Sequence, residues 1–278
     1  MSRPLHFGAK GLLLSLLGLR PYQAILSLGY GLILGMPPRR RRLGDNLRRI
    51  RSFNGLPTPR AEIRRHARRL AELHAEIQAS LALFAIDSDP AILGEVQLPL
   101  LSALRRLRRA GRGVILAAPH YGNLWVCAKA LDRARMPLAC ILNAPSPYRW
   151  GQTPGLRVLG RKGSARASWR FLSQNGCVLV TADMDFGAQE LRLPFFGAAF
   201  PAPRDVARLS RLSGAPVLPV CAVKRAGRLS LECGAAIDPG RATIPAIAGR
   251  LLRAMEGFIG SDPSQWLLLS EAWGRPSR

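Results

Sequence analysis

The chain is 278 residues long and has a formal net charge of +24 at pH 7, with 41 lysines and arginines against 17 aspartates and glutamates. This length is enough for one large α/β domain with a well-buried core, which we favour, or for a core domain with a helical appendage. The five cysteines are odd in number and lack Cys-x-x-Cys spacing, which argues against a disulfide framework and against a zinc site. So basic a surface attracts polyanions, and nucleic acid, anionic lipid headgroups and an acidic protein are the three classes to weigh.

The first segment in chain order is apolar from residue 11 to 36, with one interruption at Arg20 and Pro21. Neither half reaches the ~20 apolar residues that a membrane-spanning helix needs. Residues 1–36 are therefore predicted to form a membrane-associating segment that lies in or dips into the interface, with the arginines at 39–42 as a cytoplasmic-side anchor. The alternative is a helix hairpin in the core of a soluble protein.

Two amphipathic helices are predicted next. From Thr58 to Phe84 the apolar residues recur at helical spacing, and arginines cluster in the first half. A second helix, from about Leu98 to Ala110, has leucines opposite its arginines and stops at Gly111. The arginines of either helix alone are typical of a solvated face, and only their joint excess favours a negatively charged partner.

Beyond Gly111, apolar strands alternate with helices. Strands separated by helices indicate an α/β fold, in which a mostly parallel central sheet is flanked by helices and ends in a hairpin. Residues 37–278 are expected to form a single domain. The expected strands are 114–118, 138–142, 178–182, 191–195, 217–224 and 229–233, and the expected helices are 123–133, 164–173, 205–213, 244–259 and 265–273, with a loop through Gly155.

His120 is the first candidate for chemistry. It directly follows the strand at 114–118 and precedes Tyr121, Gly122 and Asn123, the last of which is a good N-cap for the next helix. This corner places the imidazole at the end of a strand, near the positive end of a helix, where the neutral, proton-accepting form is favoured. A lone histidine is often structural, and the strand-to-helix corner is what favours a catalytic one.

Two acids and an aromatic motif follow further along the chain. Asp183 and Asp185 leave an apolar strand two residues apart, and they project to one side if the chain stays extended. They can orient a histidine, hold a substrate hydroxyl or pair with surface arginines. Phe195, Phe196 and Gly197 offer a rigid aromatic surface, suited to flanking an acyl chain but equally to closing a core.

Taken together, these motifs resemble the lysophospholipid acyltransferase superfamily, and most closely its branch of late acyltransferases of lipid A biosynthesis. The resemblance covers most of the chain and implies the α/β acyltransferase fold, with helices on both faces of the sheet. It rests on the order and spacing of DNLRRI at 45–50, PHYGN at 119–123, Arg161, DMDFG at 183–187, LPFFG at 193–197, SGAPVLPV at 213–220 and DPSQWLLLSEAW at 262–273.

The resemblance also implies a catalytic motif, His-x4-acid, whose histidine deprotonates an acceptor hydroxyl that attacks a thioester while the acid orients the ring. His120 matches the base, but the acid position falls on Trp125, and Met184 stands where relatives usually have a polar residue. Asp183 and Asp185 complete the predicted catalytic set. The predicted substrate-binding residues are Tyr121, Gly122, Asn123, Trp125, Arg161, Phe195, Phe196 and Gly197.

Three accounts of the missing acid remain open. In the first, Asp183 or Asp185 replaces the absent partner of His120. In the second, His120 acts alone on a more acidic nucleophile. In the third, the chain is a non-catalytic relative that binds lipid or carrier and assists a true enzyme.

The expected function is that of an acyltransferase, peripheral or monotopic at the cytoplasmic face of a bacterial inner membrane. It would move a fatty acyl group from acyl carrier protein or acyl-CoA to a hydroxyl or amine of a lipid or glycolipid; the alternative is a non-catalytic lipid- or carrier-binding pseudoenzyme. An acidic carrier, the phosphates of coenzyme A and an anionic membrane surface all match the charge. No metal or other cofactor is implied. Aromatic residues make up 6% of the chain and do not alternate with the arginines, which disfavours nucleic acid as a partner.

Overall fold

The computed structural model describes residues 13–14, 16–85, 96–142, 156–160, 163–184 and 191–273. The chain divides into two compact units. The first comprises Met1–Pro90, Pro147–Arg149 and Ile259–Arg278, and the second comprises Ala91–Ser146 and Trp150–Phe258. The N-terminal helices therefore share a unit with the C-terminal segment of the chain.

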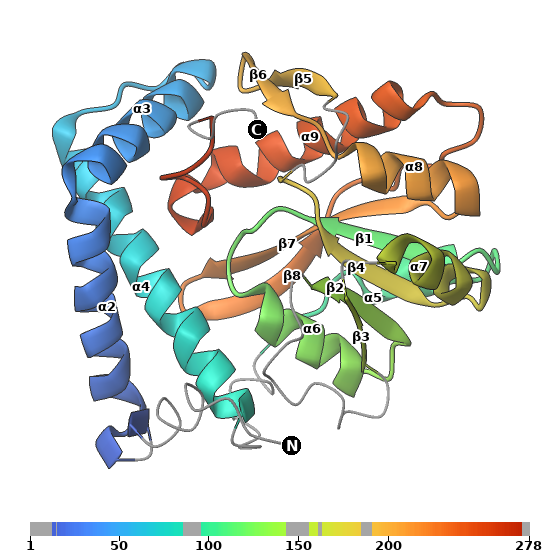
Figure 1. Ribbon diagram of the computed structural model, residues 1–278, viewed down its shortest axis with the longest axis horizontal. Coiled ribbons are helices and arrows are strands. Elements are labelled where there is room, and N and C mark those ends of the chain that lie inside the picture. Colours follow the sequence, from blue (N-terminus) through green and yellow to red (C-terminus); the bar gives the residue numbers. More distant parts are fainter. Residues whose placement is uncertain are drawn as a thin grey trace. The chain divides into compact units, whose positions relative to one another are not determined.

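The second unit is built around a six-stranded sheet in the order β3-β2-β4-β1-β7-β8 (Figure 1). Neighbouring strands pair in parallel except β7 and β8, which form an antiparallel hairpin. The predicted, mostly parallel sheet with a hairpin at its late edge is therefore confirmed. The strands are β1 (Val114–Ala118), β2 (Leu138–Leu142), β3 (Leu156–Gly160), β4 (Cys177–Thr181), β7 (Val217–Arg225) and β8 (Arg228–Cys233).

Helices flank this sheet on both faces. The connection from β1 to β2 through α6 (Leu124–Arg133) runs along the sheet in one direction. The connections through α7 (Ser164–Ser173) and α8 (Arg204–Ser213) run in the other direction. Since such connections are right-handed, α6 lies on one face and α7 and α8 lie on the other, and α7 and α8 indeed contact each other. This unit also contains α5 (Leu101–Arg108) and most of α9 (Ile244–Ser261).

The centre of the sheet is apolar on both faces. All five residues of β1 are fully buried, as expected for a parallel strand covered on both sides. The cysteines at 127, 140, 177 and 221 are buried, which confirms these four as small core residues, whereas the one at 233 is half-buried. Burial raises the pKa of Cys140, Cys177 and Cys221 to about 12, so these thiols stay protonated at neutral pH.

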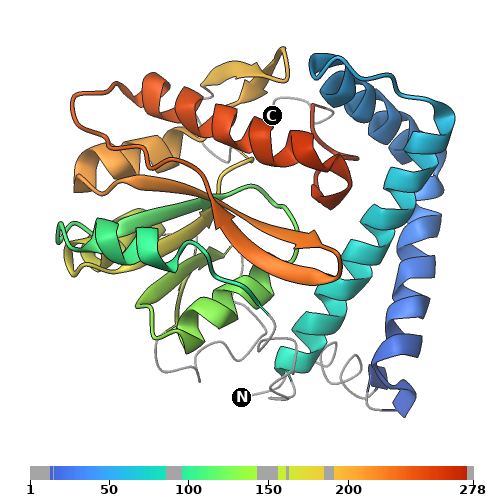
Figure 2. The same cartoon turned by 180° about the vertical axis from the view of Figure 1, so that it is seen from behind.

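The first unit is helical. It contains α2 (Leu19–Gly35), α3 (Pro37–Phe53) and α4 (Arg60–Ala85), and α2 lies along α4 (Figures 1 and 2). Met36 separates α2 from α3 with φ −57° and ψ 137°, the extended conformation that a residue before proline prefers. Within the described ranges, no helix combines the length and the apolarity needed to cross a bilayer.

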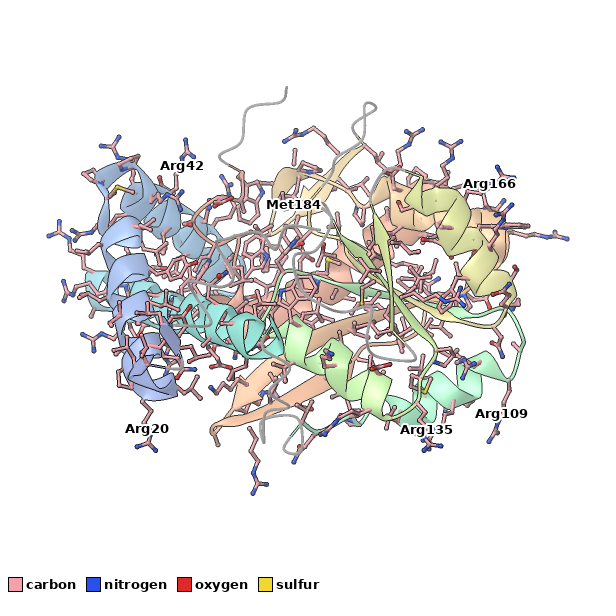
Figure 3. All side chains as sticks on the ribbon, turned by 60° about the horizontal axis from the view of Figure 1, so that its bottom comes forward. Arg20, Arg42, Arg109, Arg135, Arg166 and Met184 are labelled. Atoms are coloured by element: carbon pink, nitrogen blue, oxygen red, sulfur yellow. The ribbon has the colours of Figure 1, made fainter. Side chains whose placement is uncertain are left out.

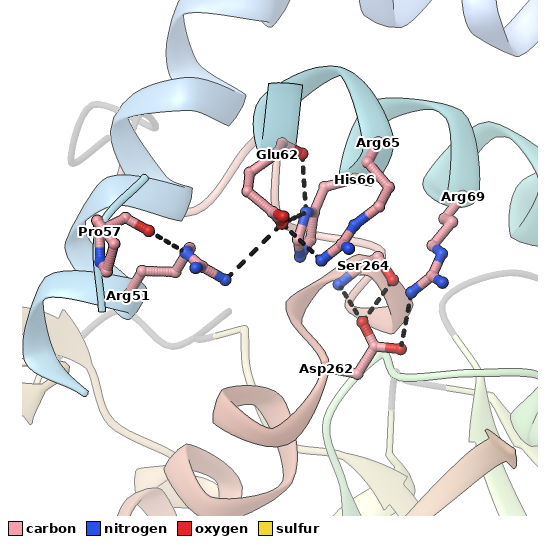
Figure 4. Close-up of polar contacts among 8 residues, drawn as sticks. All are labelled: Arg51, Pro57, Glu62, Arg65, His66, Arg69, Asp262 and Ser264. Carbon is pink, nitrogen blue, oxygen red and sulfur yellow. Dashed lines mark hydrogen bonds and ion pairs between the residues drawn. The ribbon is translucent and has the colours of Figure 1, made fainter. Parts of the chain in front are cut away.

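Ion pairs connect α4 with the end of α3 and with the C-terminal segment of the same unit (Figure 4). Glu62 accepts a hydrogen bond from Arg65 at 2.6 Å and lies 3.8 Å from Arg51 Nη1. Arg69 lies 4.0 Å from Asp262, whose Oδ1 accepts the backbone N–H of Ser264 at 3.2 Å. Two of the four arginines clustered in the first half of α4 thus bind acids within the unit.

Four elements differ from the predictions, and one of them is the strand β6 (Ala198–Pro201), which was not predicted. The arginine-rich stretch after Met36 is the helix α3, because proline is well suited to the first turn of a helix. Residues 156–160, which directly follow the predicted loop and were assigned to no element, form the edge strand β3, while residues 143–155 lie outside the described residues.

The predicted helix at 265–273 is wrong. A short 3-10 helix (Pro263–Gln265) is followed by turns. Asn46 Nδ2 donates to the carbonyl oxygens of Leu269 and Ala272, at 2.9 and 2.8 Å. A side chain from α3 therefore satisfies carbonyls of this segment that local helical bonds would otherwise serve.

Candidate active site

His120 and Asp183 lie opposite each other, just past the carboxyl ends of two neighbouring parallel strands. In the β1–β4 pair, Ala118 lies beside Thr181, and a bond from the Ala182 N–H to the Ala118 carbonyl (2.8 Å) continues the ladder. Each of these two residues is two positions beyond the last residue of its strand. The register therefore brings their side chains together although they are 63 residues apart in sequence.

Two hydrogen bonds join this pair. Asp183 Oδ1 lies 2.5 Å from His120 Nδ1, and Asp183 Oδ2 accepts the backbone N–H of His120 at 2.7 Å. The Asp183 side chain is 0% exposed, whereas that of His120 is 27% exposed. A buried carboxylate requires such donors, and the second bond fixes its orientation toward the ring.

This arrangement has the chemistry of a general base. When Nδ1 of the neutral imidazole donates to the carboxylate, Nε2 carries the lone pair. The partly exposed ring can then take a proton from a substrate, and the carboxylate stabilises the imidazolium that forms. Of the two acids proposed from sequence, Asp183 is thus the one seen beside His120, while Asp185 lies outside the described residues.

Gly122 and Asn123 shape the turn between His120 and α6. Gly122 has φ +60°, and a Cβ added there would lie 1.7 Å from the carbonyl oxygen of Ala222 on β7. The Asn123 side chain accepts the N–H of Val126 at 3.4 Å, which confirms it as the N-cap of α6. Only glycine permits this close approach of the turn to the sheet.

Gly122→Ala is expected to destabilise the protein by about 3 to 5 kcal/mol, because the new methyl group overlaps the backbone of β7. Gly111→Ala is the matched control, since Gly111 also has a positive φ (+71°) but no atom within 4 Å of the added Cβ. Gly111→Ala is expected to lower the free energy of unfolding by about 1 to 2 kcal/mol, because alanine is strained in the left-handed backbone conformation. Denaturant unfolding measures the stability of both variants. Equal unfolding midpoints would contradict the close contact between position 122 and the backbone of β7.

The other predicted site residues occupy varied environments. Tyr121 is buried, and Trp125 is half-buried in the first turn of α6. Phe195 and Phe196 are buried in the hairpin of β5 (Arg192–Phe195) and β6 (Ala198–Pro201). Arg161 lies outside the described residues. The substrate-binding roles of these residues stay predictions.

Glu256 is a residue that sequence reasoning missed. Its Oε1 accepts the backbone N–H of Phe196 at 2.5 Å. Phe196 and Gly197 form the two-residue turn of the β5–β6 hairpin with φ of +47° and +73°, as a type I′ turn requires. The one signal in the sequence is that Glu256 is the only carboxylate in the otherwise apolar and basic helix α9.

Glu256→Ala is expected to destabilise the protein by about 1 to 3 kcal/mol, because it leaves the N–H of the buried Phe196 without this acceptor. Glu256→Gln retains an acceptor oxygen, so it is expected to destabilise the protein by less than half as much as Glu256→Ala. As a control, Glu232→Ala removes an exposed pair with Arg225 (3.2 Å) and costs about 0 to 1 kcal/mol. Thermal or denaturant unfolding ranks the three, and Glu256→Ala behaving like Glu232→Ala would refute the role.

Comparison with known proteins adds a family and two relatives. The family model described as bacterial lipid A biosynthesis acyltransferase matches residues 79–275. The phosphatidylinositol mannoside acyltransferase of Mycolicibacterium smegmatis (strain ATCC 700084 / mc(2)155) is 26% identical over 175 residues, which cover 59% of this chain and 58% of that protein. Its counterpart in Mycobacterium tuberculosis (strain ATCC 25618 / H37Rv) is 25% identical over 175 residues, covering 59% and 55%. The match spans little more than half the length of these relatives.

Among solved structures, the pilus retraction motor PilT with bound ADP aligns with a TM-score of 0.30 and 13% sequence identity. The alignment covers 64% of this chain and 61% of that chain. A similarity this low carries no argument about fold or function.

Proposed function

Because the chain belongs to the bacterial lipid A biosynthesis acyltransferase family, we propose that it transfers a fatty acyl group to a hydroxyl or amine of a lipid or glycolipid. In this proposal His120 is the general base and Asp183 is the carboxylate that orients it. The observation that carries the assignment is the 2.5 Å contact between His120 Nδ1 and Asp183 Oδ1. Asp183 thus takes, from a neighbouring strand, the role of the acid that is absent at Trp125.

The proposed reaction starts from the neutral imidazole of His120, whose Nε2 carries the lone pair. Nε2 removes the proton of the acceptor hydroxyl or amine as the acceptor oxygen or nitrogen attacks the thioester carbonyl carbon. The tetrahedral intermediate then breaks its C–S bond, and the imidazolium returns the proton to the leaving thiolate. Asp183 stabilises the transient positive charge and holds the neutral ring in the tautomer whose Nε2 carries the lone pair.

The acceptor, the donor and the location are finer parts of the proposal. The two mycobacterial relatives are named for phosphatidylinositol mannoside, a glycolipid, which supports a lipid or glycolipid acceptor here. The donor is acyl carrier protein or acyl-CoA, because both are anionic and this chain has a net charge of +24. The same charge supports a peripheral location at the anionic cytoplasmic face of a bacterial inner membrane.

Direct transfer tests the proposal. The purified chain is mixed with radiolabelled acyl carrier protein or acyl-CoA and a lipid extract of bacterial inner membranes, and labelled lipid is separated by chromatography. Labelled lipid is expected to form with at least one donor. Binding of donor or lipid without any transfer would instead support the non-catalytic alternative.

A further inference from the structure

Two large hydrophobic side chains are exposed on the second unit. Within the described ranges, Trp169 on α7 and Leu212 on α8 are the exposed large hydrophobic residues that belong to this unit. Trp169 is 46% exposed and Leu212 is 68% exposed. The buried residues of the two helices are others, namely Ser168, Phe171, Leu172, Val206, Ala207 and Ser210. Packing of the helices on the sheet therefore does not require an apolar side chain at position 169 or 212.

Positive charge accompanies these two side chains along both helices. Together α7 and α8 contain five arginines and one aspartate. Arg166 and Arg170 are exposed neighbours of Trp169, and Arg208 is exposed one turn before Leu212. Figure 3 shows Arg166 on the outer surface of α7. Within the described ranges, no ion pair joins any of these three arginines to an acid.

The two helices cover the strands that lead to the candidate active site. Helix α7 contacts β4, β3 and β2, and α8 contacts β1 and β7. Helix α7 starts shortly after β3 ends, and α8 ends shortly before β7 starts, so both run opposite to the parallel strands. Their N-terminal ends therefore lie toward the edge of the sheet where His120 and Asp183 meet.

We propose that the outward face of α7 and α8, made of Arg166, Trp169, Arg170, Arg208 and Leu212, is the docking surface for an acidic protein, the acyl carrier that presents the thioester. We call this surface the carrier face. Tryptophan and arginine are enriched among the residues that contribute most to protein interfaces, and an acidic partner is complementary to the arginines. The inference deepens the proposed function and rests on it, because it selects carrier protein over acyl-CoA as the donor.

Other partners match the carrier face less well. Coenzyme A is small, whereas these side chains are spread over the outer faces of two helices of 10 residues, each about 15 Å long. A second copy of this chain would place arginines against arginines, and each chain has a net charge of +24. A carrier protein holds its acyl group on a flexible arm, so docking above β1 and β4 allows the thioester to reach His120.

Binding to carrier protein tests the apolar contacts. The full chain is titrated with purified bacterial acyl carrier protein that bears a palmitoyl thioester, and calorimetry gives Kd. Trp169→Ala is expected to raise Kd by about 30-fold and Leu212→Gln by about fivefold. Leu28→Gln is the matched control, because Leu28 on α2 is 69% exposed, and it is expected to bind the carrier like the parent. Since the replaced side chains are exposed, all three variants are expected to fold, and circular dichroism checks this.

The charge contribution is tested separately. Replacing Arg166, Arg170 and Arg208 together by glutamine is expected to raise Kd by about two- to fivefold per arginine, and added salt should weaken binding of the parent more than of this variant. The same replacement of three exposed arginines at α5 is the control, and it is expected to change Kd by about twofold at most. These control residues are Arg105, Arg106 and Arg109.

Kinetics and vesicle binding decide between the partners. With acyl carrier protein as donor, Trp169→Ala is expected to raise KM without lowering kcat, and with acyl-CoA as donor it should change neither. The inference is overturned if the carrier does not bind or if the carrier-face variants bind it like the parent. It is also overturned if these variants lose only their binding to phosphatidylglycerol vesicles, which would make the face a lipid contact.

The carrier face and the catalytic proposal are read out independently. Asp183→Asn is expected to bind the carrier with the Kd of the parent, because Asp183 is buried beside His120 and not on the outer face of α7 or α8. Carrier binding that depends on Trp169 and the three arginines, but without any acyl transfer, would support the carrier face and contradict the proposed enzymatic function.

Discussion

Asp183→Asn is expected to lower kcat for acyl transfer by about 10⁴-fold, the loss seen when the orienting carboxylate of a catalytic triad becomes an amide. The amide oxygen can still accept a hydrogen bond, but it carries no charge to stabilise the imidazolium. The amide group can also present N–H to Nδ1, which favours the tautomer whose Nε2 is already protonated. Steady-state kinetics should show the loss in kcat with little change in KM for the donor.

A matched control separates catalysis from folding. Asp132 is also a buried carboxylate of the second unit, located on α6 rather than beside His120. Asp132→Asn should retain kcat within a few-fold of the parent after normalisation to folded protein. If Asp183→Asn stays within tenfold of the parent, or if both variants lose activity equally, Asp183 is not the partner of the base.

His120→Ala has the larger expected effect, a loss of about 10⁶-fold in kcat, as for removal of the histidine from a comparable catalytic unit. The reason is that no proton acceptor remains for the acceptor hydroxyl. The double variant His120→Ala/Asp183→Asn should be no slower than His120→Ala alone, because the carboxylate acts only through the ring. Labelled-lipid formation under single-turnover conditions measures all three variants.

The control for this experiment is His74→Ala, which removes a partly buried histidine from the first unit and should leave kcat nearly unchanged. Additive losses in the double variant would indicate that the two residues act independently. Equal rates in the parent and in His120→Ala would show that the measured transfer does not use this site.

Much of the fold was predictable because the relevant signals are local. The run at 114–118 is short, uninterrupted and apolar, which favours a buried parallel strand over a helix, and the observed bounds of β1 agree. The helix at 164–173 was likewise predicted with its observed bounds. Helix α3 was missed because proline favours a helix only in its first turn, where Pro37 lies. Strand β3 was missed because it is a half-exposed strand at the edge of the sheet and lacks a clear apolar run.

The sequence by itself determined the chemistry that is available: a histidine at one strand end, two acids near another, and no acid at the expected position, Trp125. It left open which acid, if either, meets the histidine. The register of β1 and β4 decided this, because pairing Ala118 with Thr181 sets His120 against Asp183 across the sheet edge. A local pattern specifies which face of a strand is buried, but strand register is a property of two segments far apart in the chain, so only the tertiary structure could supply the partner.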